Sequence, residues 1–399
     1  MMREICNITD DSYSGGLERR DIEEQVDGQT KEEERGTDHP LPISKEERRL
    51  VTTSVDFIVR SLEEQIADGS LILQDPHERR HVWDNIKSSR LIESLLLNVP
   101  IPTFYLAEIG DGEYAVIDGQ QRLTAIHNFI NNGYRLSGLK VKNELNGLKF
   151  KKMSPQDQRL IKSRPLRCII IMRESSPIVR FDVFERLNTA SVQLSPQELR
   201  NCLYRGPLNE MLVQLANNQD FMYVRRVNRV DQRMKDEETI LRFFALHSNL
   251  PHYLGNLKEF LDTFQADNAS LKEVTLNQYK ALFERVISDV RYVFEDNAFR
   301  KYNHEIGSWE TPVNRPLYEA VVLCYANANS EYIRSNRDAL LNLHKSLCSN
   351  EKFLDAISVA TVHRLRVKTR ISMYREAMIQ AGIPVKEFDW WSESSEESE

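Results

Sequence analysis

The sequence predicts an α+β fold, in which an N-terminal α+β domain is followed by an α-helical domain. Before about residue 207, short apolar and β-branched runs alternate with segments of helical periodicity. After it, apolar residues recur only at helical spacing. A chain of 399 residues is long enough for two domains. We divide it into a disordered acidic segment (1–43), an α+β domain (44–230), an α-helical domain (231–386) and an acidic tail (387–399).

The net charge of −7 is unevenly distributed along the chain. Residues 1–40 carry 12 acidic and 5 basic residues, and residues 387–399 carry 6 acidic residues and no basic one. The body between these ends has a net charge of +6. A mildly basic body could face nucleic acid or nucleotide. An ordinary solvated surface is the other interpretation of this excess.

Sequence composition also indicates the cellular compartment of the protein. No apolar run is long enough to span a bilayer, and no basic-then-apolar leader opens the sequence. The five cysteines are odd in number, scattered and never spaced as Cys-x-x-Cys. They fit reduced thiols, and neither a disulfide framework nor a zinc site. We expect a cytoplasmic protein with no membrane partner.

Capping residues, turn residues and periodicity place the elements. The capping-box spacing at 44–47 predicts a helix that continues through Val51, Val55 and Ile58 to Leu62. The other elements of the first domain are a strand at 71–73, a helix at 85–97, a hairpin of 104–106 with 114–117, a helix from 118–122 to 131–133, a helix from 154–155, a strand at 166–172, a helix from 176 to 189 and a capping box at 195–198. The clearest later helices span 240–246, 279–294, 316–325, 339–347 and 359–380.

A polar run, Asp118-Gly119-Gln120-Gln121-Arg122, falls on the turn between the hairpin and the next helix. Gly119 lets the backbone turn tightly and approach a ligand closely. The positive end of the helix points back at this turn, which suits an anion such as phosphate. Arg122 adds a forked, permanent cation. A helix start capped by Asp118 is the alternative interpretation.

Three stretches resemble one known family, that of the N-terminal domain of GmrSD-type restriction enzymes, within the ParB-like superfamily. Residues 117–123 resemble its signature. Residues 75–84 resemble its early Gln-Arg…Val-Trp motif through Arg79, Val82 and Trp83, although Glu78 stands where Gln is usual. Residues 184–201 resemble its Phe-x-Arg-Leu-Asn-Thr…Leu-Ser-x-Gln-Glu-Leu-Arg block, with Ala190-Ser191 in place of the usual Gly pair. Order and spacing both hold over roughly residues 45 to 245.

This resemblance implies a ParB-like fold for the first domain and a nucleotide-binding, NTP-hydrolysing module of a bacterial anti-phage or restriction-type system. Arg122 and Arg79 would hold phosphates against the backbone of Gly119. Asp118 would hold a divalent cation, Mg²⁺ with a nucleoside triphosphate, or polarise water. Gln120 and Gln121 would orient water or the ligand. Asp118, Gln120, Gln121 and Arg122 are thus the predicted catalytic residues.

Further nucleotide contacts are predicted around this turn. By resemblance, the segment with Glu185, Arg186, Asn188 and Thr189 borders the nucleotide pocket; a plain helix end with Asn188 as cap is the alternative. Trp83 could stack a base or belong to the core. Arg90 could reach a phosphate. A second basic group on one helix could bind a phosphate backbone: Arg364, Arg366, Lys368 and Arg370. For all of these cations, an ordinary solvated surface is the alternative interpretation.

Two other functions stay open. One is a metal-dependent DNA nuclease acting from the same ParB-like pocket, and the other is a non-enzymatic nucleic-acid sensor switched by nucleotide. The sequence contains no Walker-type loop, His-Glu-x-x-His motif, Cys/His quartet or His-Asn-His motif. The partner that the resemblance implies is a nucleoside triphosphate, with DNA and a partner effector protein as further candidates.

Overall fold

A computed structural model describes residues 49–73, 83–187 and 194–390. The predicted disordered segment 1–43 and most of the predicted acidic tail lie outside these ranges. Three predicted nucleotide contacts, Arg79, Asn188 and Thr189, also lie outside them.

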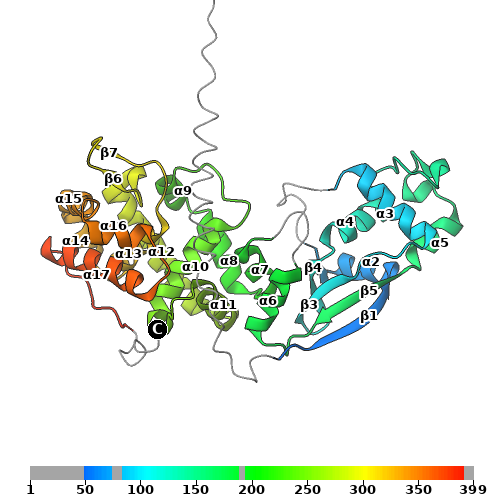
Figure 1. Cartoon of the computed structure of the whole chain (residues 1–399), viewed down its shortest axis with the longest axis horizontal. Coiled ribbons are helices and arrows are strands. Elements are labelled where there is room, and N and C mark those ends of the chain that lie inside the picture. Colours follow the sequence, from blue (N-terminus) through cyan, green and yellow to red (C-terminus); the bar gives the residue numbers. More distant parts are fainter. Residues whose placement is uncertain (1–48, 74–82, 188–193, 391–399) are drawn as a thin grey trace, which may run out of the picture.

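The N-terminal part is a mixed five-stranded sheet with helices on both faces, which confirms the predicted α+β class (Figure 1). The strands lie in the order β1-β5-β3-β4-β2, with β1–β5 and β3–β4 antiparallel and β5–β3 and β4–β2 parallel. The elements are β1 (Thr52–Ile58), α2 (Val59–Asp68), β2 (Leu71–Ile72), α3 (Asn85–Leu97), β3 (Phe104–Gly110), β4 (Glu113–Asp118), α4 (Gln120–Ile130), η2 (Asn143–Leu145), η3 (Phe150–Lys152), α5 (Pro155–Lys162), β5 (Pro165–Ile171), α6 (Pro177–Leu187) and α7 (Pro196–Leu203).

The predicted helix through Val51, Val55 and Ile58 is wrong, because this segment is the edge strand β1. It runs antiparallel to β5, with Thr52 opposite Ile171 and Ile58 opposite Pro165. Alternate residues Val55 and Phe57 pack on the core while their neighbours are exposed. The partner strand lies more than 100 residues away in sequence, so apolar spacing within the segment could not reveal it. The helix begins only at Val59.

Strand alternation places two apolar layers on the two faces of the sheet. One face, including Leu106 and Val116, packs against α2, α3, α4 and α5. The other face, including Ala107 and Ile117, packs against α6 and α7. Ala266 and Ala269 of the helical part pack against the same apolar cluster. The α6–α7 pair therefore lies between the sheet and the helices that follow (Figure 1).

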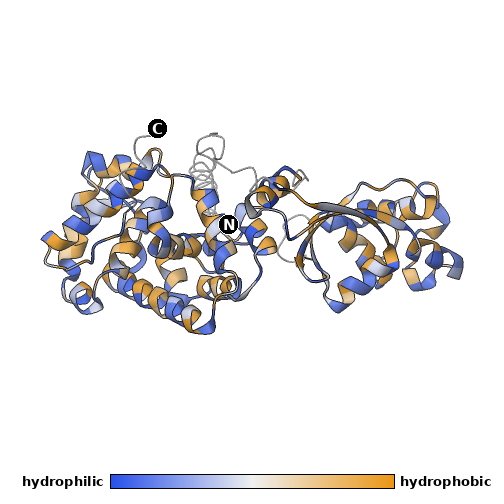
Figure 2. Cartoon of the chain, turned by 90° about the horizontal axis from the view of Figure 1, so that it is seen from below, coloured by the Kyte–Doolittle hydropathy of each residue, from blue (hydrophilic) through white to orange (hydrophobic). Residues whose placement is uncertain are grey.

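The second part is helical, as predicted, apart from one short hairpin. Its helices pack their apolar faces inward and leave hydrophilic residues outside, a pattern visible along the ribbons in Figure 2. Its elements are α8 (Pro207–Ala216), α9 (Gln219–Arg225), α10 (Lys235–Asn249), η4 (Leu250–His252), α11 (Leu257–Asn268), α12 (Glu273–Phe294), η5 (Glu295–Asn297), β6 (Tyr302–Asn303), β7 (Ser308–Trp309), α13 (Arg315–Ala326), α14 (Ser330–Ser335), α15 (Arg337–Leu347), α16 (Glu351–Ser358) and α17 (Arg364–Gln380).

Two details of the helical part differ from the sequence prediction or refine it. The helix predicted over 359–380 begins only at Arg364, because residues 359–363 form the turn between α16 and α17. The acidic tail starts with Phe388 and Trp390 packed on the helical core, their ring centroids 5.7 Å apart. The apolar start of the tail is thus docked on the protein.

A buried histidine in this core gives the stability a pH dependence. His344 is inaccessible to solvent; its Nε2 lies 3.1 Å from the carbonyl oxygen of Arg300 and its Nδ1 lies 3.2 Å from the Tyr374 hydroxyl. Burial lowers the pKa of His344 to about 4. The unfolded chain takes up the proton first. The stabilisation that comes from keeping His344 neutral is therefore fully present above pH 6.5 and is lost as the pH falls toward 4.

We expect this histidine to lower the free energy of unfolding by about 2 kcal/mol between pH 7 and pH 5. Urea unfolding of the wild type and of His344→Gln at the two pH values measures it, because the glutamine amide nitrogen can take the place of Nε2 and donate to the Arg300 carbonyl oxygen but does not titrate. The pH-dependent loss should be smaller in the variant by about that amount. An equal loss in both proteins would show that His344 does not stay neutral in the folded state.

Candidate functional site

The polar turn joins the end of β4 to the start of α4. Gly119, not Asp118, is the N-cap of α4, and no side chain caps the helix. Gly119 has φ 98°, in the left-handed region that favours glycine. Asp118 remains in the sheet, opposite Tyr105 of β3. The alternative interpretation of Asp118 as a helix cap is therefore wrong.

Gly119 is also required by packing. A Cβ atom at this position would overlap the Phe104 ring and would come within 3.3 Å of Arg122 Nη2. The space beside the glycine is thus filled by an aromatic side chain at the start of β3. The small size of Gly119 thus allows this packing at the strand-to-helix turn, a role that the sequence alone did not indicate.

Arg122 holds this turn together. Its Nη2 donates to Asp118 Oδ2 at 2.7 Å and to the Thr103 carbonyl oxygen at 3.3 Å, and its Nη1 donates to the Pro102 carbonyl oxygen. Its Cζ lies 4.5 Å from the centroid of the Phe104 ring. Burial lowers the pKa of Arg122, and the Asp118 charge opposes this shift. The guanidinium therefore fixes the Asp118 carboxylate and the entry to β3.

The remaining residues of the turn differ in exposure. The Arg122 side chain is 11 % exposed and that of Asp118 is 25 % exposed. Gln120 is buried, and Gln121 is half-buried on the first turn of α4. The structure thus brings all five residues of the polar run to one turn, with Asp118 as its most accessible charged group.

Two further candidates lie near the start of α3. Trp83 is half-buried against the sheet core, and the Lys87 ammonium lies 4.5 Å from the centroid of its ring. Arg90 is exposed on α3. One face of the Trp83 ring is therefore occupied by a cation, and Arg90 belongs to the surface.

The second predicted motif lies on the opposite face of the sheet from α4. Glu185 binds Lys258 of α11, and Arg186 pairs with Asp182 one turn earlier at 3.0 Å. Helix α6 packs through Phe181 and Phe184 under Ile117 of β4, whereas α4 covers the other face. The described part of this motif thus connects α6 with the helical part.

A set of buried polar residues on α7 was not among the predicted site residues. Arg200 Nε donates to Asp262 Oδ1 at 2.6 Å, and its Nη1 donates to Glu238 Oε2 at 3.2 Å. Gln197 Nε2 donates to Gln265 Oε1 at 3.0 Å. The signal available in the sequence was three polar residues at 197, 200 and 201 on one side of a capping-box helix whose other side carries leucines.

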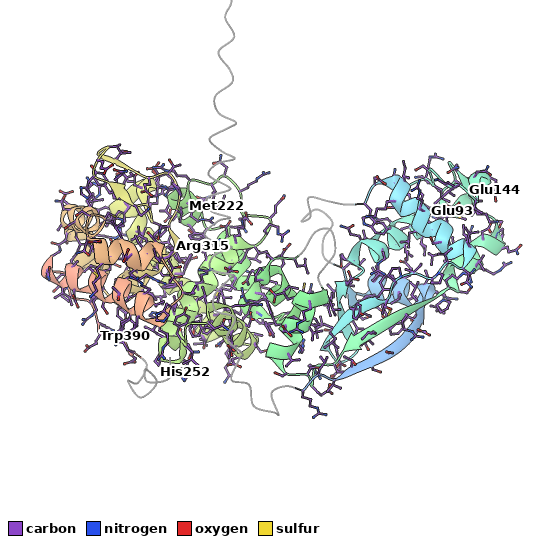
Figure 3. The ribbon with its side chains drawn as sticks, in the orientation of Figure 1. Glu93, Glu144, Met222, His252, Arg315 and Trp390 are labelled. Carbon is purple, nitrogen blue, oxygen red and sulfur yellow. The ribbon has the colours of Figure 1, made fainter. Side chains whose placement is uncertain are left out.

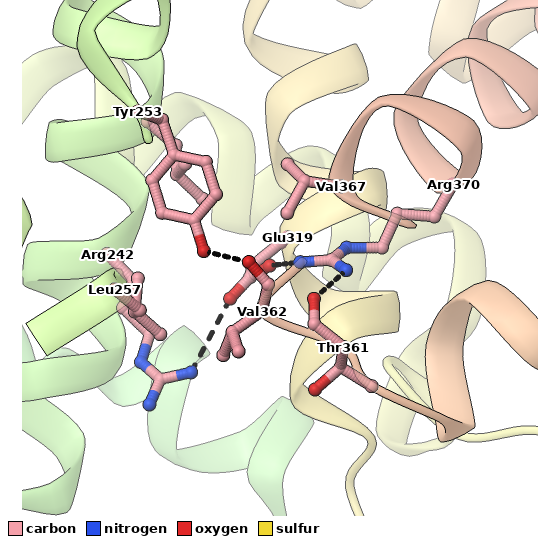
Figure 4. A pocket seen from close by; sticks show the side chains of 9 residues that line it. Arg242, Tyr253, Leu257, Glu319, Thr361, Val362, Val367 and Arg370 are labelled. Atoms are coloured by element: carbon pink, nitrogen blue, oxygen red, sulfur yellow. Dashed lines mark hydrogen bonds and ion pairs between the residues drawn. The ribbon is translucent and has the colours of Figure 1, made fainter. Parts of the chain in front are cut away.

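These contacts continue as a chain of alternating charges through the helical core. From Glu238 the chain passes to Arg242 at 2.9 Å, then to Glu319 at 3.5 Å, and ends on Arg370 of α17. Arg242, Glu319 and Arg370 line a narrow hollow, shown in Figure 4. The predicted basic face of α17 is thus partly internal, since Arg364 and Arg370 are both buried.

The two carboxylates nearest α7 respond differently to this environment. Burial raises the pKa of Asp262 to about 6, against the pull of Arg200. Burial also acts to raise the pKa of Glu238, but Arg242, Arg200 and Arg315 together outweigh it and lower the pKa to about 2. Glu238 is therefore the firmly ionised link between Arg200 and Arg242.

The described residues offer neither a metal cluster nor a membrane span. Among residues 49–73, 83–187 and 194–390, no group of three or more His, Cys, Asp or Glu side chains is placed to hold a metal ion. Within the same residues, every helix is too short or too polar to cross a bilayer.

The fold and the turn define a class of protein, an α+β domain with a polar strand-to-helix turn, joined through α6 and α7 to a helical domain. Residues 62–205 match the family described as GmrSD restriction endonuclease, N-terminal domain. This match confirms the resemblance seen in the sequence. The matched region contains the turn at 118–122 and ends just after α7. No curated protein matches the chain.

Proposed function

We propose that the matched domain binds a nucleoside triphosphate with Mg²⁺ at the turn 118–122 and hydrolyses it, as a module of a bacterial restriction-type or anti-phage defence system. The observation that carries this proposal is the Asp118 carboxylate, which is partly exposed at the positive end of α4 and held there by Arg122 at 2.7 Å. The family's description as a restriction endonuclease domain supports the defence context.

The residues present fit a magnesium nucleotide. Mg²⁺ at such sites commonly takes one or two carboxylates together with phosphate oxygens and water. Asp118 supplies one carboxylate, and the N-terminal end of α4 favours the negative charge of phosphates. Bound Mg²⁺ would neutralise charge that develops on the transferred phosphoryl group.

The side chains around Asp118 have separate roles in this proposal. Arg122 is a positioning residue, because its guanidinium donors contact Asp118 and two carbonyl oxygens of the protein. Gln121, half-buried on the first turn, orients the attacking water, and the buried Gln120 supports it. The proposal keeps the predicted nucleotide contacts of Arg79, Trp83, Arg90, Asn188 and Thr189. It gives Glu185 and Arg186 a supporting role instead, since they pair with Lys258 and Asp182.

Turnover by the full-length protein tests this function. The four ribonucleoside triphosphates are supplied with Mg²⁺, with and without DNA, and released phosphate is measured. We expect one or more to be hydrolysed, and we expect Asp118→Asn to reduce kcat/KM at least tenfold, the equivalent of about 1.4 kcal/mol. Asparagine can still accept the hydrogen bond from Arg122, so thermal stability should change little. Asp157→Asn on α5 is the matched control.

Gln121→Ala separates water positioning from binding. If Gln121 orients the attacking water, the variant should lose kcat while KM stays close to the wild-type value. An equal change in binding would assign Gln121 to the ligand instead. Nucleotide binding without phosphate release would favour the non-enzymatic sensor, and Mg²⁺-dependent nicking of plasmid without nucleotide would favour the nuclease.

A further inference from the structure

The basic excess of the body is concentrated in one segment. Residues 131–164 contain nine basic and two acidic residues, a net charge of +7. The whole body, residues 41–386, has a net charge of only +6. The basic character that the sequence suggested for the body therefore belongs to this one segment, which we call the basic end.

The basic end lies on the outer side of the α+β unit, away from the helical part. It follows the C-terminus of α4 and includes η2, η3 and α5, and Glu144 marks it at the far edge of Figure 3. Helix α4 has 11 residues and is about 16 Å long. The basic end is thus separated from the turn at 118–122 by the length of this helix.

The backbone of the basic end is held in a defined shape. Glu93 of α3 is buried, and its Oε1 accepts hydrogen bonds from the backbone N–H groups of Lys140, Val141 and Lys142 at 3.1, 2.8 and 2.8 Å. Lys151 N donates to Asn132 Oδ1 at 2.9 Å. These contacts anchor two lysine-bearing loops to α3 and to the end of α4.

Its cationic side chains are presented to solvent. Six of them are exposed: Arg135, Lys140, Lys151, Lys152, Arg159 and Lys162. The Lys162 ammonium lies 5.5 Å from the centroid of the Phe150 ring, next to Lys151 and Lys152 in the chain. Lys162 therefore lies beside the segment that carries Lys151 and Lys152.

The acidic groups described nearby form no ion pair with Lys151 or Lys152. Glu144 lies 3.7 Å from Lys142, and Asp157 accepts the Ser154 hydroxyl at 2.6 Å. Glu93 serves the backbone, and Glu63 lies 3.3 Å from His127 while Lys162 acts on it from farther away. Within the described ranges of the chain, no carboxylate forms an ion pair with Lys151 or Lys152.

We propose that the basic end binds the phosphate backbone of duplex DNA without reading its sequence. Exposed lysines on a fixed backbone suit phosphate contacts, which position a protein on a duplex and carry most of its salt-dependent affinity. Val141 is the only large apolar residue in the described segment that is strongly exposed. A single valine offers little to a lipid bilayer or to a hydrophobic protein interface.

The test is fluorescence anisotropy of a labelled short DNA duplex with the full-length protein, without nucleotide, from about 50 to 200 mM KCl. The test variant combines Lys151→Gln, Lys152→Gln and Lys162→Gln. We expect its DNA affinity to fall at least tenfold. The slope of log K against log[KCl] should become less steep by up to about 3, one for each lost phosphate contact.

The matched control combines Lys272→Gln, Lys352→Gln and Lys386→Gln, which makes the same charge change at three exposed sites outside the basic end. It should bind DNA nearly as the wild type does. Equal losses in both triple variants, or unchanged binding in the test variant, would overturn the proposal. So would a strong sequence preference, or binding only to phosphatidylserine vesicles. Because no nucleotide is present, failure here is distinct from failure of the proposed hydrolysis.

Discussion

Gly119→Ala is expected to destabilise the α+β unit by roughly 2–5 kcal/mol. Two costs add at this position. The backbone has φ 98°, which a residue with a Cβ adopts only with strain. The new methyl group would also overlap the Phe104 ring, which is fully buried and cannot simply move away. Urea unfolding of the purified variant measures the sum.

Gly147→Ala is the matched control for this change. Gly147 has φ 83°, but a Cβ there would meet no atom within 4 Å. It should therefore carry only the backbone cost, about 1–2 kcal/mol. Phe104→Leu combined with Gly119→Ala should be less than additive, because the leucine relieves the overlap. Equal destabilisation at positions 119 and 147 would show that crowding by Phe104 is unimportant.

Arg200→Met is expected to cost about 3–5 kcal/mol, because it leaves two buried carboxylates without their shared cation. Asp262 and Glu238 both contact the Arg200 guanidinium. Arg60→Met is the control, since Arg60 forms an exposed pair with Glu64 at 2.9 Å. Loss of an exposed pair one turn apart should cost only about 0.5 kcal/mol.

Removing one of the uncompensated charges should restore part of the loss. The double variant Arg200→Met, Asp262→Asn is expected to be more stable than Arg200→Met alone at pH 7. The same comparison at pH 5 should show a smaller benefit, because burial raises the pKa of Asp262 to about 6 and the lone carboxyl would take up a proton. No rescue at either pH would contradict the assignment of Asp262 as the charge that depends on Arg200.

Elements with local signals were predictable from the sequence. Helix α3 spans 85–97 as predicted, because Asp84 caps its start and the left-handed Asn98 ends it. The capping box at Ser195 and Glu198 is present at α7. The hairpin of β3 and β4 also follows its turn residues. In each case the information lies within a few residues of the element.

Features set by distant partners were not predictable in this way. The strand character of β1 depends on β5, and the burial of Arg370 depends on Glu319, 51 residues earlier. For the candidate site, the sequence placed the polar run on a strand-to-helix turn. It could not show that Phe104 fills the space beside Gly119, or that Arg122 contacts the carbonyl oxygens of residues 102 and 103.

The most direct test of the proposed function is equilibrium binding of a slowly hydrolysed nucleotide analogue with Mg²⁺, measured by calorimetry. Wild type and Asp157→Asn should bind alike, whereas Asp118→Asn should bind at least tenfold more weakly, a loss of about 1.5–3 kcal/mol for one interaction with a charged group. The effect should largely disappear when Mg²⁺ is replaced by EDTA. Equal binding by Asp118→Asn and the wild type, or no binding of any nucleotide, would contradict a magnesium-nucleotide site at this turn.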